Sequence, residues 1–340
     1  MIVAGAASVS LPVDDGSDAS AGRSRFLARA VVLALLAAAM VGGCGSARET
    51  PDRASGAPAS RVLIEAPPSA ALSRHADGGL LVAPLAGGPI GFVRRDGRLI
   101  DSRFRTPPVR TDGQRGVLSL ALSPEDVLYA SGTPRGSDRL VVGILGRRGS
   151  AVIWNGPRTT QAANGGHLEF EPDGRLVIGI GESKLRPGAS GAILSLDPNG
   201  PPNQVPRILS TGWNNPFAFA FTPDGDLWVA DNATGRQPER LARGDAGKPY
   251  DVTNLPRKHA PSGLAALPNG DLALCGVVSG TLDRYRHQSD GQWKRIGTIA
   301  TRCRYGVALL TDGRLAYAED DAIRVVSKDV LEAGGADSDS

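Results

Sequence analysis

Short apolar segments separated by tight turns repeat along most of the chain. The clearest unit joins two apolar runs through an Asp-Gly turn, as in FAFTPDGDLWVAD at residues 219–231. Asp-Gly and Asn-Gly between such runs predict β-hairpins, because type I′ turns need positive φ at both central positions. A leucine follows each turn, and these leucines are Leu80, Leu128, Leu176, Leu227, Leu272 and Leu315. A repeat of 43 to 51 residues with several strands per unit predicts the blades of a β-propeller.

Six copies of the unit predict an all-β fold, a six-bladed propeller with four-stranded blades. The copy at residues 124–128, PEDVL, is the weakest because it lacks the glycine. The last run, AIRVVSK after Asp321, leaves its blade one strand short, and RVLIEAP at 61–67 could complete it from the N-terminus. Such closure removes an exposed sheet edge. We therefore expect the propeller at residues 61–330 and a disordered tail at 331–340.

A different pattern precedes the repeats. Three arginines lead into an apolar run at residues 30–41, which is too short to span a bilayer but fits the core of a secretory signal. The run ends in Val41-Gly-Gly-Cys44, which looks like a bacterial lipobox, in which the cysteine is lipidated after cleavage. The alternative is a chance cysteine after a signal helix. Residues 1–22 are acidic and unlike the start of a signal, which suggests a misassigned start.

We therefore expect a signal peptide at residues 1–43 and a lipidated Cys44 that anchors the protein to the outside of the cell membrane. Residues 44–60 are small and polar and predict a flexible tether. The formal charge of +3 is small, and no basic stripe alternates with aromatic residues, so nucleic acid is not an expected partner. Outside the cell, Cys275 and Cys303 can form a disulfide; the alternative is two buried thiols that never meet.

The antiparallel order of strands in a blade brings polar residues together on one side of the ring. Residues just before each innermost strand and just after each second strand share a face, here called the top face, and ligands bind at such a face in most propellers. The residues predicted on the top face are Gln114, Arg115, Ala163, Asn164, Glu182, Trp213, Asn214, Asn215, Asp231, Asn232, His259, Arg302 and Arg304.

Two polar residues interrupt a column of small residues on the innermost strands. When the strands are aligned by their turns, most blades place Ser, Ala or Gly near the axis, where strands crowd together. The third blade places His167 and Glu169 there instead. They are either a polar pair satisfied within the core or a proton-handling pair that faces the central channel.

Four segments together carry a family resemblance. GVLSLALSPED (116–126), NGGHLEFEPDGRLVIGIGES (164–183), GAILSLDPNG (191–200) and GWNNPFAFAFTPDGDLWVADN (212–232) occur in an order that resembles the soluble glucose/sorbosone dehydrogenases. These are six-bladed propellers that oxidise sugars with pyrroloquinoline quinone (PQQ) and calcium. The resemblance covers roughly residues 65–325, and lipid-anchored chains of this kind are similar to actinobacterial lipoproteins classed with the same family.

The resemblance also shows departures. The family's catalytic histidine falls on Ala163, which cannot accept a proton, and its arginine beside the quinone falls on Asn214. The family's aspartate falls on Glu182, a carboxylate one methylene longer. A surviving base would therefore have to be His167 or Glu182, because histidine and carboxylates are suited to general base catalysis.

Other positions keep the family's residue types. The resemblance implies that Gln114 and Asn164 contact the substrate. It also implies that the paired guanidiniums of Arg302 and Arg304 bind the carboxylates of the quinone. The resemblance also implies calcium held by backbone carbonyls of the loop Asp231–Arg236 and by carboxylates, with Asp231 as a candidate ligand.

Three hypotheses remain open at this point. The first is an envelope lipoprotein that binds a sugar, glycan or other small ligand at the channel mouth with weak or lost dehydrogenase activity. The second is an active PQQ-dependent aldose dehydrogenase with a substituted base. The third is a structural scaffold without a ligand. Fold alone does not separate them, because propellers host many functions.

Overall fold

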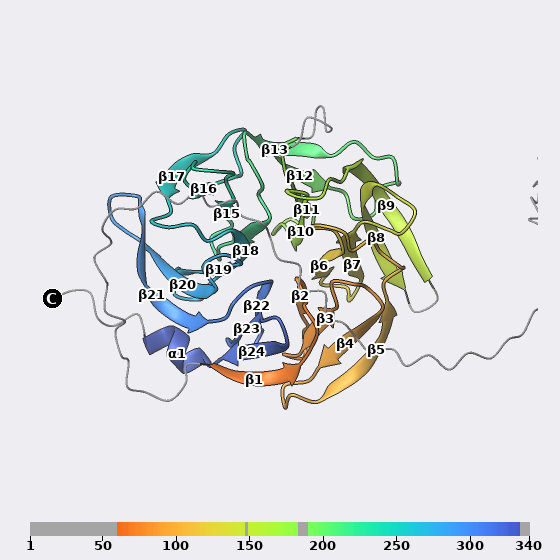
Figure 1. Cartoon of the computed structure of the whole chain (residues 1–340), viewed down its shortest axis with the longest axis horizontal. Coiled ribbons are helices and arrows are strands. Elements are labelled where there is room, and N and C mark those ends of the chain that lie inside the picture. Colours follow the sequence, from red (N-terminus) through yellow and green to blue (C-terminus); the bar gives the residue numbers. More distant parts are fainter. Residues whose placement is uncertain (1–59, 147–148, 183–189, 334–340) are drawn as a thin grey trace, which may run out of the picture. The chain divides into compact units, whose positions relative to one another are not determined.

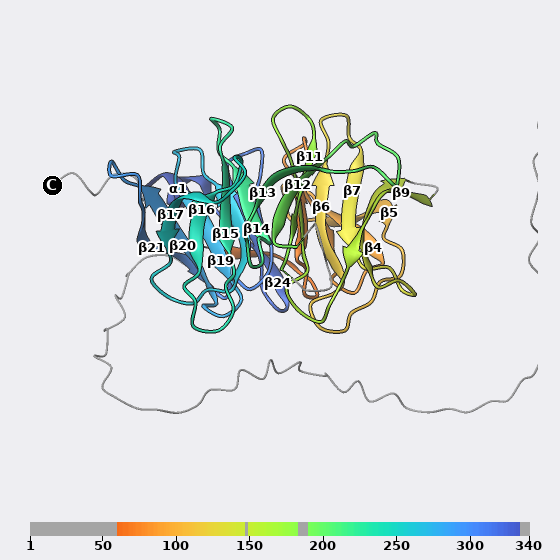
Figure 2. The same ribbon diagram turned by 90° about the horizontal axis from the view of Figure 1, so that it is seen from above.

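Six four-stranded antiparallel sheets form a ring, which confirms the predicted propeller (Figure 1). The computed structural model describes residues 60–146, 149–182 and 190–333. The predictions for the signal segment, for Cys44 and for nearly all of the tether lie outside these residues. Figure 2 shows the ring from the side, with loops projecting from its two opposite faces.

The first three complete blades follow one another along the chain. The first blade consists of β2 (Ala71–Arg74), β3 (Leu80–Ala83), β4 (Pro89–Val93) and β5 (Leu99–Arg105). The second consists of β6 (Val117–Leu122), β7 (Leu128–Gly132), β8 (Arg139–Gly146) and β9 (Gly149–Arg158). The third consists of β10 (Gly165–Phe170), β11 (Leu176–Ile180), β12 (Ala192–Leu196) and β13 (Arg207–Thr211).

The remaining blades complete the ring. The fourth consists of β14 (Ala218–Phe221), β15 (Leu227–Asp231), β16 (Arg240–Arg243) and β17 (Tyr250–Asn254). The fifth consists of β18 (Pro261–Ala266), β19 (Leu272–Gly276), β20 (Thr281–His287) and β21 (Trp293–Thr301). The sixth consists of β22 (Val307–Leu309), β23 (Leu315–Ala318), β24 (Ala322–Val326) and β1 (Ser60–Glu65).

The turn between the first two strands of each blade explains the repeat. Gly174, between β10 and β11, has φ of 86°, a backbone conformation that glycine adopts with less steric strain than other residues. Its N–H donates a hydrogen bond to Glu171 O at 2.9 Å. In the second blade, Asp126 takes the corresponding conformation with φ of 60°. Aspartate tolerates this region better than most residues, so the weak PEDVL copy still forms its hairpin.

The N-terminal strand closes the ring as predicted. β1 pairs antiparallel with β24 as the outermost strand of the sixth blade, for example through Arg61 and Val325. Ser60 Oγ also lies 2.8 Å from Tyr317 Oη on β23. The first strand of the fold and the last blade therefore hold each other, although they lie at opposite ends of the propeller sequence.

Apolar side chains fill the space within and between blades, and small residues occupy several of the positions where innermost strands approach one another. Trp213, Phe219, Tyr285 and Tyr317 are among the largest fully buried side chains. Consecutive innermost strands pack against one another around the ring. A Cβ on Gly263 in β18 would lie only 2.9 Å from Val307 N of the next blade, so the close approach at the axis requires small residues.

The C-terminal boundary predicted at residue 330 is three residues early. Helix α1 (Lys328–Ala333) follows β24, and Leu331 is only 2% exposed because it packs into the core beside Leu315 and Val326. Arg284 also donates a hydrogen bond to Leu331 O. Residues 334–340 lie outside the described part. No helix among the described residues is long and apolar enough to cross a membrane.

Candidate functional site at the top face

The loop before β10 carries Ala163, onto which the resemblance places the family's base. Ala163 there has φ of 52°, and its N–H donates a hydrogen bond to Gln114 Oε1 at 2.8 Å. Gly165 follows with φ of 67°, and a Cβ at this position would lie 2.2 Å from Gly179 O of β11. The two glycines of the motif therefore keep this loop against the neighbouring strand, while the side chain at its apex is a methyl group.

The two predicted substrate contacts hold this loop together. Asn164 is 3% exposed, and its Nδ2 donates to Gln114 O at 3.1 Å and to Thr160 O at 2.9 Å. Its Oδ1 accepts from Thr160 N at 2.7 Å. Gln114 is exposed, but its side-chain oxygen accepts a hydrogen bond from Ala163 N. The structure thus brings Gln114, Asn164 and Ala163 together, in a network that fixes the loop.

Asp231 anchors the neighbouring loop rather than facing solvent. Its carboxylate is 1% exposed and accepts hydrogen bonds from Asn214 N at 3.0 Å and from Asn215 N at 2.8 Å. Arg240 completes the set, with its Nη2 3.0 Å from Asp231 Oδ2. Asn215 passes the connection on, because its Oδ1 accepts from Gly165 N at 3.0 Å. Sequence analysis did not identify the role of Arg240, which lies nine residues after its partner.

The predicted calcium ligand does not fit a metal site. Both oxygens of Asp231 already accept N–H groups, and a cation would have to displace the positively charged Arg240. Among the described residues, no group of three or more His, Cys, Asp and Glu side chains could hold a metal ion.

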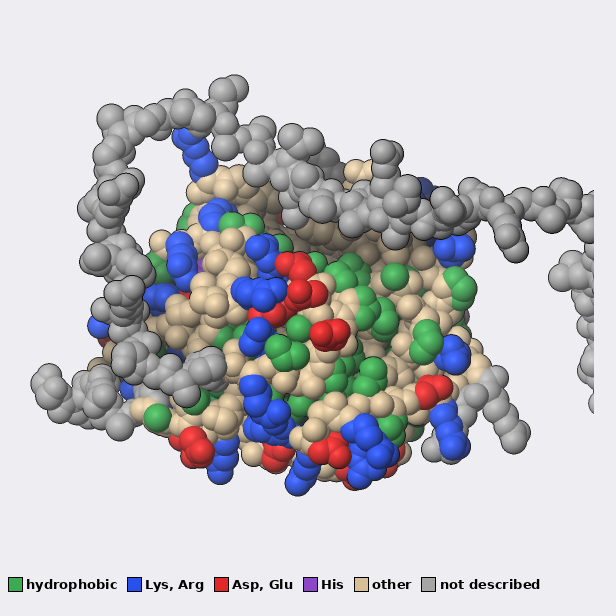
Figure 3. Space-filling view, turned by 60° about the horizontal axis from the view of Figure 1, so that its bottom comes forward, with side chains coloured by type: hydrophobic (Ala, Val, Ile, Leu, Met, Phe, Trp, Pro, Cys, Tyr) green, Lys and Arg blue, Asp and Glu red, His purple; other side chains and the backbone are tan. Residues whose placement is uncertain are grey.

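The predicted quinone clamp is paired with carboxylates of the same blade. Arg302 lies 3.0 Å from Asp321 and 3.4 Å from Glu319, and Arg304 lies 3.3 Å from Asp320. Both guanidiniums are about half exposed, so a polyanion could reach them only in competition with these carboxylates. Charges of the two signs also lie beside one another on the face shown in Figure 3. With Asn214 at the third position, PQQ would have one cationic contact fewer than the resemblance implies and would compete with these carboxylates for the other two.

Glu182 lies near Ala163 on the top face. It follows β11, its side chain is exposed, and its N–H donates to Asn214 O at 2.5 Å. The preceding residue, Gly181, approaches the Ala163 carbonyl so closely that a Cβ there would lie 2.0 Å from it. The structure therefore brings Glu182, Ala163 and Asn214 to one place on the top face.

His167 and Glu169 face a cavity of about 170 Å³ at the ring axis. Burial lowers the pKa of His167 to about 4 and raises the pKa of Glu169 to about 8, which favours the neutral form of each side chain. The His167 ring packs edge-on against Phe219, and its Nδ1 lies 3.4 Å from Ser119 Oγ. Among the described residues that line this cavity, none is a predicted substrate, quinone or calcium contact. The structure thus separates His167 from the top-face loop.

His259 is buried and belongs to a polar network inside the fifth blade. Its side chain is fully buried, with Nδ1 3.2 Å from Ser279 Oγ and Nε2 3.0 Å from Tyr285 Oη. Burial lowers its pKa to about 4, against the nearby charge of Asp283, which raises it. This histidine therefore holds the turn after β19 and is not available at the surface.

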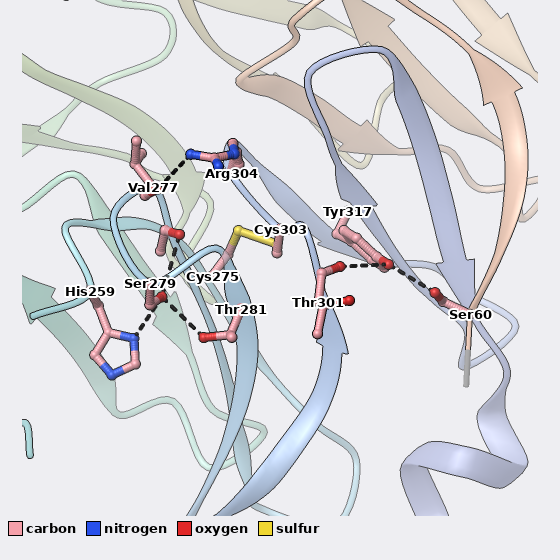
Figure 4. The surroundings of a disulfide bond; sticks show 11 residues. Ser60, His259, Cys275, Val277, Ser279, Thr281, Thr301, Cys303, Arg304 and Tyr317 are labelled. Carbon is pink, nitrogen blue, oxygen red and sulfur yellow. Dashed lines mark hydrogen bonds between the residues drawn. A yellow bond between two sulfur atoms is a disulfide. The ribbon is translucent and has the colours of Figure 1, made fainter. Parts of the chain in front are cut away.

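Cys275 and Cys303 form a disulfide that joins the fifth blade to the start of the sixth (Figure 4). Cys275 lies in β19, and Cys303 lies between β21 and β22; both side chains are buried. Arg304, next to Cys303, donates to Val277 O at 3.1 Å. The bridge thus fixes the segment that carries Arg302 and Arg304.

The propeller matches a known family and several solved structures. Residues 65–250 match the family model described as Glucose / Sorbosone dehydrogenase. The soluble aldose sugar dehydrogenase of Escherichia coli, solved in the apo form, is 20% identical with a TM-score of 0.64, covering 78% of this chain and 98% of that chain. The PQQ-bound aldose sugar dehydrogenase of Streptomyces coelicolor is 21% identical with a TM-score of 0.63, covering 78% and 97%.

More distant solved structures share the fold as well. A gluconolactonase of Xanthomonas campestris is 18% identical with a TM-score of 0.56, covering 78% of this chain and 88% of that chain. At these identities the solved structures establish the propeller fold and do not establish which reaction or ligand belongs to this chain. The search among curated proteins found no match.

Proposed function

The chain belongs to the glucose/sorbosone dehydrogenase family, and from this membership we propose that it binds a sugar or glycan at the top face without oxidising it. One feature supports the proposal: the resemblance places the family's base on Ala163, which cannot accept a proton and whose N–H donates a hydrogen bond to Gln114. Oxidation at a sugar C1 hydroxyl requires a proton acceptor, and loss of a catalytic base typically costs about 10²–10⁴-fold in rate.

The surrounding groups support recognition of hydroxyls more than redox chemistry. The guanidiniums that the resemblance assigns to the quinone are paired with Glu319, Asp320 and Asp321. The exposed Glu182 carboxylate and the half-buried Asn214 and Asn232 add hydrogen-bonding groups from the third and fourth blades to the same face. Amides, carboxylates and guanidiniums can pair with the hydroxyls of a sugar, which carries no charge of its own.

A second function, an aldose dehydrogenase that uses a substituted base, is favoured by Glu182 alone. This exposed carboxylate lies next to the Ala163 position and could accept a proton there. PQQ would supply the hydride acceptor when bound. His167 is less suited to this role, because it lies at the ring axis apart from the top-face loop and burial lowers its pKa to about 4.

We also propose that the protein acts outside the cell, anchored to the membrane through a lipid on Cys44. The short apolar run and the Val41-Gly-Gly-Cys44 sequence support this location. A disulfide between Cys275 and Cys303 is consistent with an oxidising compartment.

Titration calorimetry of the purified protein with aldoses and oligosaccharides, without quinone, tests the binding function. We expect saturable binding of at least one saccharide, weakened in Glu182→Gln. The matched control is Glu125→Gln, which makes the same change at an exposed position in the turn between β6 and β7. Absence of binding across the panel, or equal weakening by the two variants, would overturn the proposal.

A further inference from the structure

A lysine side chain lies in the loop where the family resemblance implies calcium. Lys258 Nζ donates hydrogen bonds to Ala233 O at 2.9 Å and to Gln237 O at 2.6 Å. It also lies 3.9 Å from Glu239 Oε1. Its three oxygen partners all belong to the segment Asp231–Glu239, which connects β15 to the start of β16.

The carboxylate of this set is buried and binds the segment that follows Lys258. Glu239 is 2% exposed, and its Oε2 accepts hydrogen bonds from His259 N at 2.6 Å and from Ala260 N at 3.2 Å. Burial raises the pKa of Glu239 above its usual value, while these N–H groups and the charge of Lys258 lower it. The loop and the segment before β18 are therefore joined twice, once in each direction.

An ammonium group and a calcium ion compete for the same kind of ligand. Calcium binds backbone carbonyl and carboxylate oxygens, and the resemblance places such carbonyls in this loop. The lysine ammonium carries three N–H donors and one positive charge, which match two carbonyls and a nearby carboxylate. A divalent ion could enter only by expelling the ammonium, because two cations cannot share these oxygens.

We propose that the Lys258 ammonium takes the place of a calcium ion in this loop, so that the segment Asp231–Glu239 is held in its fold without a metal. The proposal does not depend on which ligand the top face binds, and its test reads stability rather than activity. The saturation of Asp231 by Arg240 supports it independently, because the second candidate ligand of the same loop is also engaged by a cation of the chain.

Thermal unfolding of the purified full chain in excess EDTA and in excess CaCl₂ is the first arm. We expect the two Tm values to agree within about 1 °C, because a ligand that binds only the native state would raise Tm. In the second arm, Lys258→Met should lower Tm by about 3–6 °C, since two loop carbonyls lose a charged donor and the buried Glu239 loses its nearby cation. Lys248→Met, which removes an exposed lysine ahead of β17, should change Tm by less than about 1 °C.

Limited trypsin digestion gives a local readout of the same change. Arg236 is exposed in the centre of the loop, and cleavage after it should be several-fold faster in Lys258→Met than in the wild type or in Lys248→Met. A Tm of the wild-type protein that rises by several degrees with calcium would overturn the proposal. Equal behaviour of the two lysine variants would overturn it as well. If Lys258→Met does not fold, the comparison of wild-type protein in EDTA and calcium still decides.

Discussion

Removal of the Asp231 carboxylate should destabilise the protein strongly, although the residue lies on the face where ligands are expected. Asp231→Ala leaves the N–H groups of Asn214 and Asn215 and the guanidinium of Arg240 without their acceptor. Breaking a buried ion pair from one side costs about 3–5 kcal/mol. Because Arg240 is 26% exposed and can turn partly to water, we expect the lower part of this range, about 3 kcal/mol.

The conservative variant separates charge from shape. Asp231→Asn keeps one oxygen for the two backbone N–H groups but turns an amide N–H₂ toward Arg240, so we expect a loss of about 1.5–3 kcal/mol. Denaturant unfolding followed by tryptophan fluorescence measures the free energy of unfolding of both Asp231 variants, since the buried Trp213 ring lies 5.3 Å from the Arg240 guanidinium. The control is Asp320→Ala on the same face, whose 59% exposed carboxylate should contribute no more than about 1 kcal/mol.

Two results would refute this account of Asp231. If the free energies of unfolding of Asp231→Ala and Asp320→Ala agree within about 1 kcal/mol, the Asp231 carboxylate is not the anchor that its hydrogen bonds indicate. Alternatively, calcium could stabilise the wild type and fail to stabilise Asp231→Ala, and the residue would then be a metal ligand. Neither result agrees with a carboxylate already saturated by N–H donors.

Three further predictions follow from the axis, the top face and the N-terminus. The raised pKa of Glu169, about 8, means that the native state keeps a proton that the unfolded state releases. The free energy of unfolding should therefore fall as pH rises from 6.5 to 8. This range lies above the window of about 4 to 6.5, in which the lowered pKa of His167 makes the free energy of unfolding rise with pH. Glu169→Gln should remove the fall between pH 6.5 and 8 when denaturation curves are compared across pH. The double variant Ala163→His with Asn214→Arg should gain aldose-dependent dye reduction over the parent when PQQ and calcium are supplied, and no gain would show that the top face lacks more than these two groups. Cys44→Ala should release the protein from the membrane fraction or leave it unprocessed; a variant that fractionates and migrates like the wild type would exclude the lipid anchor.

The architecture could be predicted because each blade carries its own local signal. Asp-Gly turns and apolar alternation depend only on neighbours in sequence, so the hairpins and their count follow from the chain itself. The closing strand could also be predicted, because a blade that lacks one strand exposes an edge. The end of the domain was harder to place: Leu331 is one apolar residue in a polar segment, and only the position of the core shows that it is buried.

The state of the candidate site depends on pairings that sequence does not specify. Gln114 could be placed on the top face, but its bond to the Ala163 N–H follows from a backbone with positive φ that alanine rarely adopts. Lys258 precedes a residue that was expected on this face, yet nothing in the local sequence directs its side chain to carbonyls 21 and 25 residues away. Long-range side-chain contacts therefore decide whether a retained family residue is available to a ligand.

The central claim is that this top face has lost sugar oxidation, and the most direct measurement is dye reduction by the purified, unmodified protein. The assay supplies PQQ, calcium and a panel of aldoses, and it compares the protein with a blank that lacks it. The account predicts no aldose-dependent reduction above the blank, because Ala163 cannot accept the proton. Sustained turnover that is abolished in Glu182→Gln would contradict it and would identify Glu182 as the base of a working dehydrogenase.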